Sequence, residues 1–329
     1  MKKTILIILG LFSGILSAFA QKDTVEVIAY WQVGDIYRYN VEESQYKIVN
    51  GTDTTGIQRT THILTLEVVD ATDSTYRVRA TAEDYQFDNP DKDEMTEEIT
   101  RKFGNVPFEF ETDECGSFKR LIISDEEIEA VYPLLDEIVD RTANKQELDA
   151  VTRNAMKKMI RTMFPKERIE GLYSAEVSPI LEFHGMWILP GSEVEYETEM
   201  PSAYGDGNII RMNGRFWVDD ELSDDYSAVI RKEEVANEED MQKVVLGVLG
   251  KTFGAIAGAF DEDAKDEIDA ALANMEIKTS VDAVAEIHVE TGWPLQYVTD
   301  TFVDVRSGDA TQNQVTSKSW EIILDDEDE

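Results

Sequence analysis

Alternating apolar and polar positions are the dominant pattern along this chain, and they predict β-strands with one face in a core. In the stretch TYRVRATAE, residues 75–83, every second side chain is apolar: Tyr76, Val78, Ala80 and Ala82. The stretch AEIHVE, residues 285–290, repeats this pattern. Similar runs occupy residues 35–49, 60–69, 103–112, 118–123, 177–189, 193–199, 209–219, 226–233, 295–305 and 315–324. We therefore predict an antiparallel sheet of about ten or more strands, with one face covered and the other in water.

A second period, of three to four residues, predicts helices inserted among these strands. Ser124 and Glu127 form a capping box that starts the first helix, and Pro133 is expected to kink it. The apolar positions of this helix are Ile128, Val131, Leu135 and Ile138.

A second helix is expected to start at Asn144, with Glu147 three residues later, and to end at Pro165. Its apolar stripe consists of Leu148, Val151, Ala155, Met159 and Met163. A third helical region is expected over residues 238–275, with a restart near Asp261.

The most apolar stretch beyond the N-terminal region is KVVLGVLGKTFGAIAGAF, residues 243–260. On a helix, Gly247, Gly250, Gly254 and Gly258 form one narrow stripe, and larger apolar side chains cover roughly 200° of the surface. An arc this wide is typical of a helix surrounded on most sides, so we favour a buried helix against the concave sheet face. Ligand contacts are predicted from this arc: Val245, Leu249, Phe253, Ile256 and Phe260.

Two alternatives for this stretch stay open. A helix that contacts a protein partner or a lipid would expose the same arc. A membrane span fits less well, because Lys251 lies near its middle, and a lysine there costs about 2.5–3.5 kcal/mol on insertion scales. The spacing of Gly250, Gly254 and Gly258 occurs at helix contacts in membranes, but in soluble proteins it also lets another backbone pass close.

The two halves of the chain share short matching motifs. Three pairs align: GDIYRY at 34–39 with GSEVEY at 191–196, TDSTYRV at 72–78 with LSDDYSAV at 222–229, and ECG at 114–116 with ETG at 290–292. An internal duplication would explain these pairs, and chance similarity among aromatic strands with glycine turns is the alternative.

The predicted architecture is therefore one α+β domain over residues 21–320, made of two halves at about 21–170 and 171–320. In it, a large, curved, half-barrel-like antiparallel sheet wraps two or three helices. Residues 321–329 are predicted to be an acidic tail.

The N-terminus carries export features. Lys2 and Lys3 precede an apolar run, and Ala18-Phe19-Ala20 resembles a cleavage site. Residues 1–20 are therefore predicted to be a signal peptide, which makes Gln21 the mature N-terminus. An uncleaved anchor is the alternative, although the run is shorter than the roughly 20 residues of a span. We expect a soluble periplasmic or extracellular protein, with no transmembrane span in the mature chain.

Charge and cysteine content narrow the set of partners. The formal net charge is −37, from 68 acidic and 31 basic residues. A surface this acidic repels phosphate backbones, so nucleic acid is not an expected partner. The single cysteine, Cys115, has no partner for an internal disulfide, and we interpret it as structural.

No motif for catalysis, a cofactor or a metal stands out. His62, His184 and His288 lie far apart in sequence, and zinc spacings, the nucleophile elbow, the phosphate loop and the dinucleotide fingerprint do not occur. The acidic stretch 261–272 has Asp266 where a calcium loop needs glycine. The acidic stretch 88–94 is interpreted as a solvated loop. We therefore expect a protein that is not an enzyme and that carries neither a cofactor nor a metal.

The motifs at 34–39, 191–196 and 291–295 (TGWPL) carry a family resemblance. Together with the signal peptide and the long meandering strands, they make the chain resemble uncharacterised secreted proteins of Bacteroidetes-type bacteria. In architecture alone it is also similar to periplasmic lipoprotein carriers of the LolA/LolB type. That second resemblance implies an open half-barrel that wraps helices and holds acyl chains.

These patterns favour an exported, non-enzymatic protein that binds a lipophilic ligand or an apolar segment between sheet and helices. The alternative is a periplasmic or surface protein–protein interaction module with no small ligand. An apolar cavity between sheet and helices would favour the first hypothesis, and an interface filled by side chains would favour the second.

Overall fold

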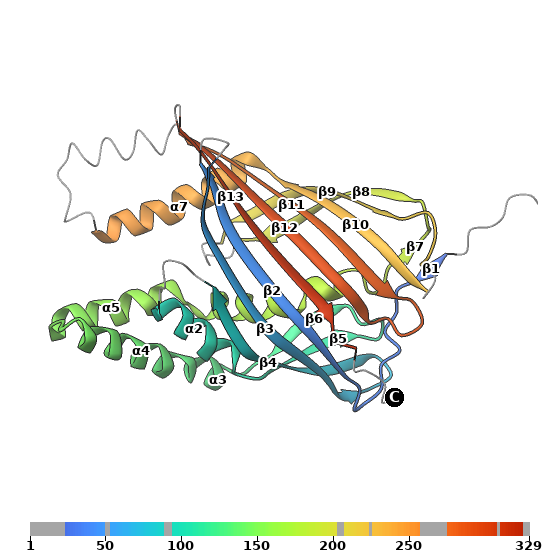
Figure 1. Ribbon diagram of the computed structural model, residues 1–329, viewed down its shortest axis with the longest axis horizontal. Helices are drawn as coiled ribbons and strands as arrows, with labels where there is room; N and C mark the ends of the chain where they lie inside the picture. Colours follow the sequence, from blue (N-terminus) through green and yellow to red (C-terminus); the bar gives the residue numbers. More distant parts are fainter. Residues whose placement is uncertain are drawn as a thin grey trace, which may run out of the picture.

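A large antiparallel sheet dominates the computed structural model, which describes residues 24–49, 53–88, 94–202, 207–223, 226–256, 275–307 and 310–324. Its 11 strands follow the order β6-β5-β4-β3-β2-β13-β12-β11-β10-β9-β8, and the sheet is not closed. Figure 1 shows the long strands running side by side. The predicted large antiparallel sheet is therefore confirmed. Two short strands, β1 (Val25–Glu26) and β7 (Trp187–Ile188), pair separately.

The strands of the sheet form one antiparallel ladder after another. Their bounds are β2 (Ile36–Val49), β3 (Asp53–Ala71), β4 (Thr75–Asp88), β5 (Phe108–Asp113), β6 (Phe118–Ile122), β8 (Glu193–Pro201), β9 (Ile209–Val218), β10 (Ser227–Ala236), β11 (Met275–His288), β12 (Pro294–Ser307) and β13 (Ala310–Ile322). Most neighbouring strands are consecutive in sequence, which is a meander, and the pairing of β13 with β2 joins the two halves.

Helices interrupt the meander after β4, after β6 and after β10. They are α2 (Glu94–Gly104), α3 (Asp125–Glu129), α4 (Val131–Lys145), α5 (Ala150–Met163), α6 (Lys166–Val177), the 3₁₀ helix η1 (Pro179–Leu181) and α7 (Glu238–Ile256). The described residues thus hold more helices than the two or three predicted. In Figure 1, α4, α5 and α7 project beyond the same end of the sheet.

The apolar side chains of the alternating pattern lie on one face of the sheet, here called the inner face. In β4, Val78 and Ala80 are fully buried, and they lie opposite Phe110 and Phe108 of β5. Helix α6 covers this face with Ile169, which is also fully buried. The same core contains Tyr173 and Val177 of α6 and, from the strands, Leu64, Leu66, Ile230, Tyr297 and Trp320. The strands bury one face because their side chains alternate with a period of two residues.

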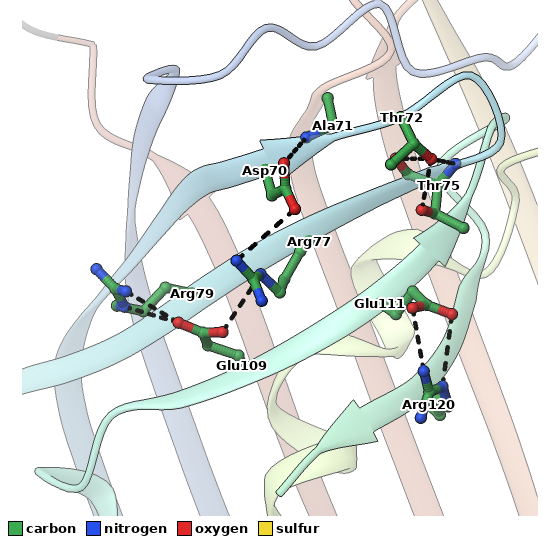
Figure 2. Close-up of polar contacts among 9 residues, drawn as sticks. All are labelled: Asp70, Ala71, Thr72, Thr75, Arg77, Arg79, Glu109, Glu111 and Arg120. Carbon is green, nitrogen blue, oxygen red and sulfur yellow. Dashed lines mark hydrogen bonds and ion pairs between the residues drawn. The ribbon is translucent and has the colours of Figure 1, made fainter.

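The other face of the sheet, the outer face, carries charged side chains in cross-strand pairs. Figure 2 shows Glu109 of β5 between two arginines of β4. Its carboxylate oxygens lie 3.5 Å from Arg77 Nε and 2.9 Å from an Arg79 guanidinium nitrogen. On the next strand, an Arg120 guanidinium nitrogen lies 3.2 Å from a Glu111 carboxylate oxygen. Opposite charges on neighbouring strands stabilise a solvated sheet face by modest amounts.

An extended segment, residues 25–31, joins two turns from different halves of the sheet; we call it the bridging segment. The backbone N–H of Ala29 donates to the carbonyl of Cys115, in the β5–β6 turn. The next N–H, of Tyr30, donates to the carbonyl of Thr291, in the β11–β12 turn. Trp31 then stacks on Trp293, with ring centroids 4.3 Å apart. The bridging segment therefore holds both turns.

The three matching motif pairs occupy corresponding places in the two halves. The two motifs of the first pair lie at the starts of β2 and β8, and those of the second pair lie at the starts of β4 and β10. The two motifs of the third pair form the β5–β6 turn and the β11–β12 turn. Each half has three meandering strands, then a helix (α2 or α7), then further strands. Across the sheet, the order β6 to β2 is repeated by the order β12 to β8.

The predicted start of the first helix is confirmed, but the predicted kink at Pro133 is not found. Ser124 and Glu127 form the capping box, in which Ser124 Oγ accepts from the Glu127 N–H and the Glu127 carboxylate accepts from the Ser124 N–H. Instead of a kink at Pro133, two helices meet at Ala130. Pro133 then falls in the first turn of α4, where its missing N–H would have no helical partner.

The predicted start of the second helix is wrong. Asn144 lies inside α4, and α5 starts after Asp149, whose carboxylate accepts from the Thr152 N–H. Aspartate is a strong N-cap because it satisfies an otherwise unpaired N–H. The apolar stripe also differs, since the side chain of Val151 is 79% exposed.

The strand predicted over 103–112 is confirmed in its second half, which is β5, whereas Phe103 and Gly104 end α2. The acidic first turn and basic last turn of α2 suit a helix dipole. The strand predicted over 177–189 is wrong over most of its length. Within 177–189, the chain forms the end of α6, η1 and turns, and only β7 is a strand. Pro179 lacks the N–H that a central strand needs. The expected restart near Asp261 lies outside the described residues, as does most of the stretch 88–94.

The bridging segment gives a direct stability prediction. A Cβ at Gly292, where φ is +71°, would lie 2.1 Å from the carbonyl oxygen of Ile28. Gly56 has a similar φ of +63° and nothing within 4 Å, so it is a matched control. Gly56→Ala should cost about 1 kcal/mol from the left-handed backbone alone. Gly292→Ala should cost about 1–3 kcal/mol more, through overpacking.

Urea unfolding of both variants tests this prediction. Equal losses of unfolding free energy in the two variants would show that the bridging segment moves away from the added Cβ without a loss of stability. The bridging segment would then not hold the β11–β12 turn.

Candidate functional site

A solvent-accessible pocket of about 430 Å³ lies between η1 and the inner face of the sheet; we call it the η1 pocket. Its apolar walls come from Phe118, Pro179, Leu181 and Val281. Its polar lining includes Lys232 of β10, Tyr297 and Thr299 of β12, and Glu182, which follows η1. This combination of apolar walls and a few convergent polar groups is typical of small-molecule sites.

A chain of polar contacts crosses the sheet at this pocket. Lys232 Nζ lies 2.6 Å from a Glu182 carboxylate oxygen and 3.3 Å from one of Glu234. The Tyr297 hydroxyl donates to Glu182 at 2.6 Å, and the Tyr196 hydroxyl donates to Glu234 at 2.7 Å. The Lys232 side chain is only 10% exposed. Buried charges persist only when they are paired and hydrogen-bonded in this way.

The two tyrosines in this network of polar contacts, Tyr297 and Tyr196, remain neutral hydrogen-bond donors. Burial raises the pKa of Tyr297 well above its usual value, and the nearby Glu182 raises it further. Burial and the hydrogen bond to Glu234 raise the pKa of Tyr196 in the same direction. With both phenols protonated, each tyrosine hydroxyl donates to one of the two carboxylates that contact Lys232.

A second polar cluster fixes α6 to the sheet. The Glu176 carboxylate lies 2.8 Å from His62 Nε2 of β3 and 2.7 Å from Lys318 Nζ of β13. Trp320 Nε1 donates to the backbone carbonyl of Glu176 at 3.1 Å. Burial alone would raise the pKa of Glu176, but Lys318 and His62 outweigh it and lower that pKa to about 2. Glu176 is therefore an ionised anchor.

Side chains fill the interface around this second cluster. Tyr173 packs on Phe108 with ring centroids 4.9 Å apart, and Val177 is fully buried. Two hollows, of about 750 and 670 Å³, lie along β8 and β9 and are lined mainly by polar side chains. Around Glu176, the described side chains of α6 and the sheet are closely packed.

The predicted ligand-contact residues on α7 are only partly described. Val245 is half-buried, and its neighbour Val244 packs in a small cluster with Ile210, Met212 and Ala236. The side chains of Leu249, Phe253 and Ile256, and all of Phe260, lie outside the described residues. Whether this arc is buried stays a prediction, and the η1 pocket is lined by other residues.

The residues of the η1 pocket were missed in the sequence, although a signal exists. The inner-face positions of β10 are Ala228, Ile230, Lys232, Glu234 and Ala236. Charged residues in the middle of an otherwise apolar face need partners, because unpaired burial is costly. Glu182 gave no such signal, since its segment was predicted to be a strand.

The remaining candidate residues take structural positions. Cys115 is a free, half-buried thiol. Burial and the neighbouring Asp113 and Glu114 raise its pKa, which disfavours the nucleophilic thiolate. His184 is buried with Nε2 2.6 Å from the Gly292 carbonyl oxygen, and burial lowers its pKa to about 4. In the described part of the chain, no three His, Cys, Asp or Glu side chains are placed to hold a metal ion.

Comparisons with known proteins add little. No protein family and no curated protein matches this chain. A solved structure described as lipid–protein interactions in lipovitellin aligns over 89% of this chain and 25% of its own, at 8% identity and a TM-score of 0.36. This chain spans about a quarter of that protein. OmpT, an outer membrane protein of Vibrio cholerae in trimer form, aligns over 88% of this chain and 100% of its own, at 9% identity and a TM-score of 0.17. Likenesses this weak do not bear on function.

None of the helices in the described ranges combines the length and the hydropathy of a membrane span.

The anchor at Glu176 predicts how stability depends on pH. The pKa of Glu176 falls from 4.5 to about 2 on folding, so its contribution is complete above pH 4.5 and is lost as the pH falls toward 2. The full contribution is about 3 kcal/mol. Glu176→Gln should therefore lower the unfolding free energy at pH 7, and the gap to wild type should narrow by about 2 kcal/mol at pH 3.

Urea unfolding at the two pH values measures this gap. Glu167→Gln, an exposed position on the same helix, is the control and should show little difference at either pH. A gap for Glu176→Gln that stays constant with pH would contradict the assignment.

Proposed function

We propose that this protein is an exported, non-enzymatic binding protein that holds a small lipophilic ligand in the η1 pocket, between the helical segment and the sheet. The observation that carries the proposal is the pocket itself. Its volume of about 430 Å³ falls within the roughly 300–1,000 Å³ of small-molecule sites. Export rests on the sequence of residues 1–20.

The lining supports a ligand with an apolar body and an uncharged polar end. Phe118, Leu181 and Val281 offer apolar contact. Tyr297 and Lys232 already contact Glu182, so an uncharged polar end suits the pocket better than an anion. The volume suits a ligand much smaller than a phospholipid.

We also propose that the protein arose by duplication of a strand–helix–strand unit, and that the sheet curves around the helical segment as a half-barrel. The corresponding motif positions and the repeated strand order support the first point. On this proposal the η1 pocket is asymmetric, because the segment α3–η1 follows only the first unit.

The alternative, a protein–protein interaction module with no small ligand, is favoured by the filled interface under α6. One measurement distinguishes the two functions: whether the η1 pocket binds a small apolar molecule.

A binding experiment tests the proposed pocket. The neutral fluorophore N-phenyl-1-naphthylamine, added to the purified full chain, should bind with increased fluorescence. Val281→Trp should fill the pocket and weaken binding by about tenfold or more, since overpacking removes the space for the ligand. Val284→Trp places the same side chain on the outer face of β11 and should leave binding unchanged.

Thermal melts of both variants keep the comparison interpretable. Mass spectrometry of organic extracts from the purified protein would identify a co-purifying ligand. If the fluorophore does not bind, or binds equally well to both variants, the interaction module becomes the better description.

A further inference from the structure

Strand β8 forms one edge of the 11-stranded sheet. It runs for nine residues, and eight of them are exposed. The opposite edge, β6, has five residues and lies beside α6. A long exposed edge strand presents a row of unpaired backbone N–H and C=O groups, which another extended chain can bind.

The register with β9 shows which backbone groups face outward. Val218 N–H donates to the Ser192 carbonyl, and Ser202 N–H donates to the Asn208 carbonyl. In an antiparallel ladder, residues that bond to a given neighbour alternate with residues that point away from it. Even-numbered residues of β8 therefore face β9. The odd-numbered residues face the open edge, and they are Glu193, Glu195, Glu197, Glu199 and Pro201.

The side chains of these glutamates lie on the outer face, and three of the four lack the cross-strand ion pairs seen elsewhere on that face. Glu193 is 3.0 Å from an Arg215 nitrogen. Glu195, Glu197 and Glu199 have no basic side chain within 4.0 Å among the residues described. On β5, by contrast, Glu109 and Glu111 are both matched by arginines (Figure 2).

A hollow of about 750 Å³ extends this acidic surface across β8, β9 and β10. Its outer-face lining includes Glu195, Glu197 and Glu233, with Arg215 as the basic residue. Arg215 is already bound by Glu193 and by Glu233, the latter at 2.8 Å. Among the described residues, the hollow therefore has more acidic than basic side chains, and it lies next to the outward-facing backbone groups of β8.

Two apolar side chains are exposed on the inner side of the same edge. Val194 is 43% exposed and Met200 is 48% exposed. A strand added beside β8 would place alternate side chains next to the glutamates and next to these apolar residues.

We propose that β8 binds an extended basic segment of a partner protein, in which lysine or arginine alternates with apolar residues, as a twelfth strand of the sheet. The charge pattern selects this occupant. A second copy of β8 would bring rows of glutamates together, which is destabilising. Nucleic acid and anionic lipid are repelled by the same charges.

Fluorescence anisotropy with synthetic peptides tests the proposal on the full chain. An eight-residue peptide of alternating lysine and valine should bind. A glutamate–valine peptide, and a peptide with its four lysines grouped together, should bind at least about tenfold more weakly. Backbone pairing is tested by N-methylating alternate residues of the binding peptide. Because only one set of N–H groups faces β8, one methylated peptide should lose binding and the other should keep it.

Protein variants locate the site. Glu195→Gln, Glu197→Gln and Glu199→Gln combined should weaken binding by about tenfold. The control combines Asp73→Asn, Glu114→Gln and Glu290→Gln, which changes the charge equally at exposed turns and should leave binding unchanged. Equal loss in both triple variants, equal binding of both methylated peptides, or self-association of the chain through β8 would overturn the proposal.

Discussion

The bridging segment is the constraint on which the arrangement around the η1 pocket depends. Two successive backbone N–H groups, of Ala29 and Tyr30, bind turns that belong to different halves of the sheet. Near the same place, the Ser117 hydroxyl donates to the carbonyl of His184, and His184 contacts the Gly292 carbonyl. The segment after η1 is therefore attached to both turns as well. An open sheet has no closing ladder to fix its curvature, and these contacts supply cross-links at one end.

Besides these backbone contacts, the inner face carries two buried clusters of charged side chains, one at Glu176 and one at Lys232. The two clusters differ in their effect on the structure. Glu176 is satisfied by the Lys318 ammonium group and by His62, and it lies among closely packed side chains of α6 and the sheet. Lys232 is satisfied by two carboxylates beside an unfilled volume. A buried ion pair rarely adds stability over apolar packing, because desolvation offsets the attraction. The contacts that Glu182 makes with Lys232 and Tyr297 instead fix the position of η1 against β10 and β12. They also place polar groups at the floor of the pocket.

The sequence predicted the sheet well because its signal is local. Alternation in β2, β4 and β9 follows directly from one buried face, and the Ser124 capping box needs only four residues. Errors arose where two local signals competed. Pro179 and Gly185 marked a break that the apolar run around them obscured, and Asp149 was a better cap than Asn144. The site could not be derived, because Glu182 and Lys232 are 50 residues apart, and their contact depends on how the segment after η1 packs against the inner face of the sheet. Only the presence of charged residues on the inner face of β10 was readable.

The two edges of the open sheet are protected in different ways against pairing with other copies of the protein. A barrel has no edges, whereas an open sheet must prevent its outermost strands from pairing with other copies. At β6 this is achieved by a short strand beside α6. At β8 it is achieved by glutamates whose backbone groups face outward. Repulsion between like charges acts against every copy of this chain, which has a net charge of −37, but it acts in the opposite sense toward a basic strand. The glutamates that oppose pairing between copies of β8 therefore also favour a basic strand at this edge.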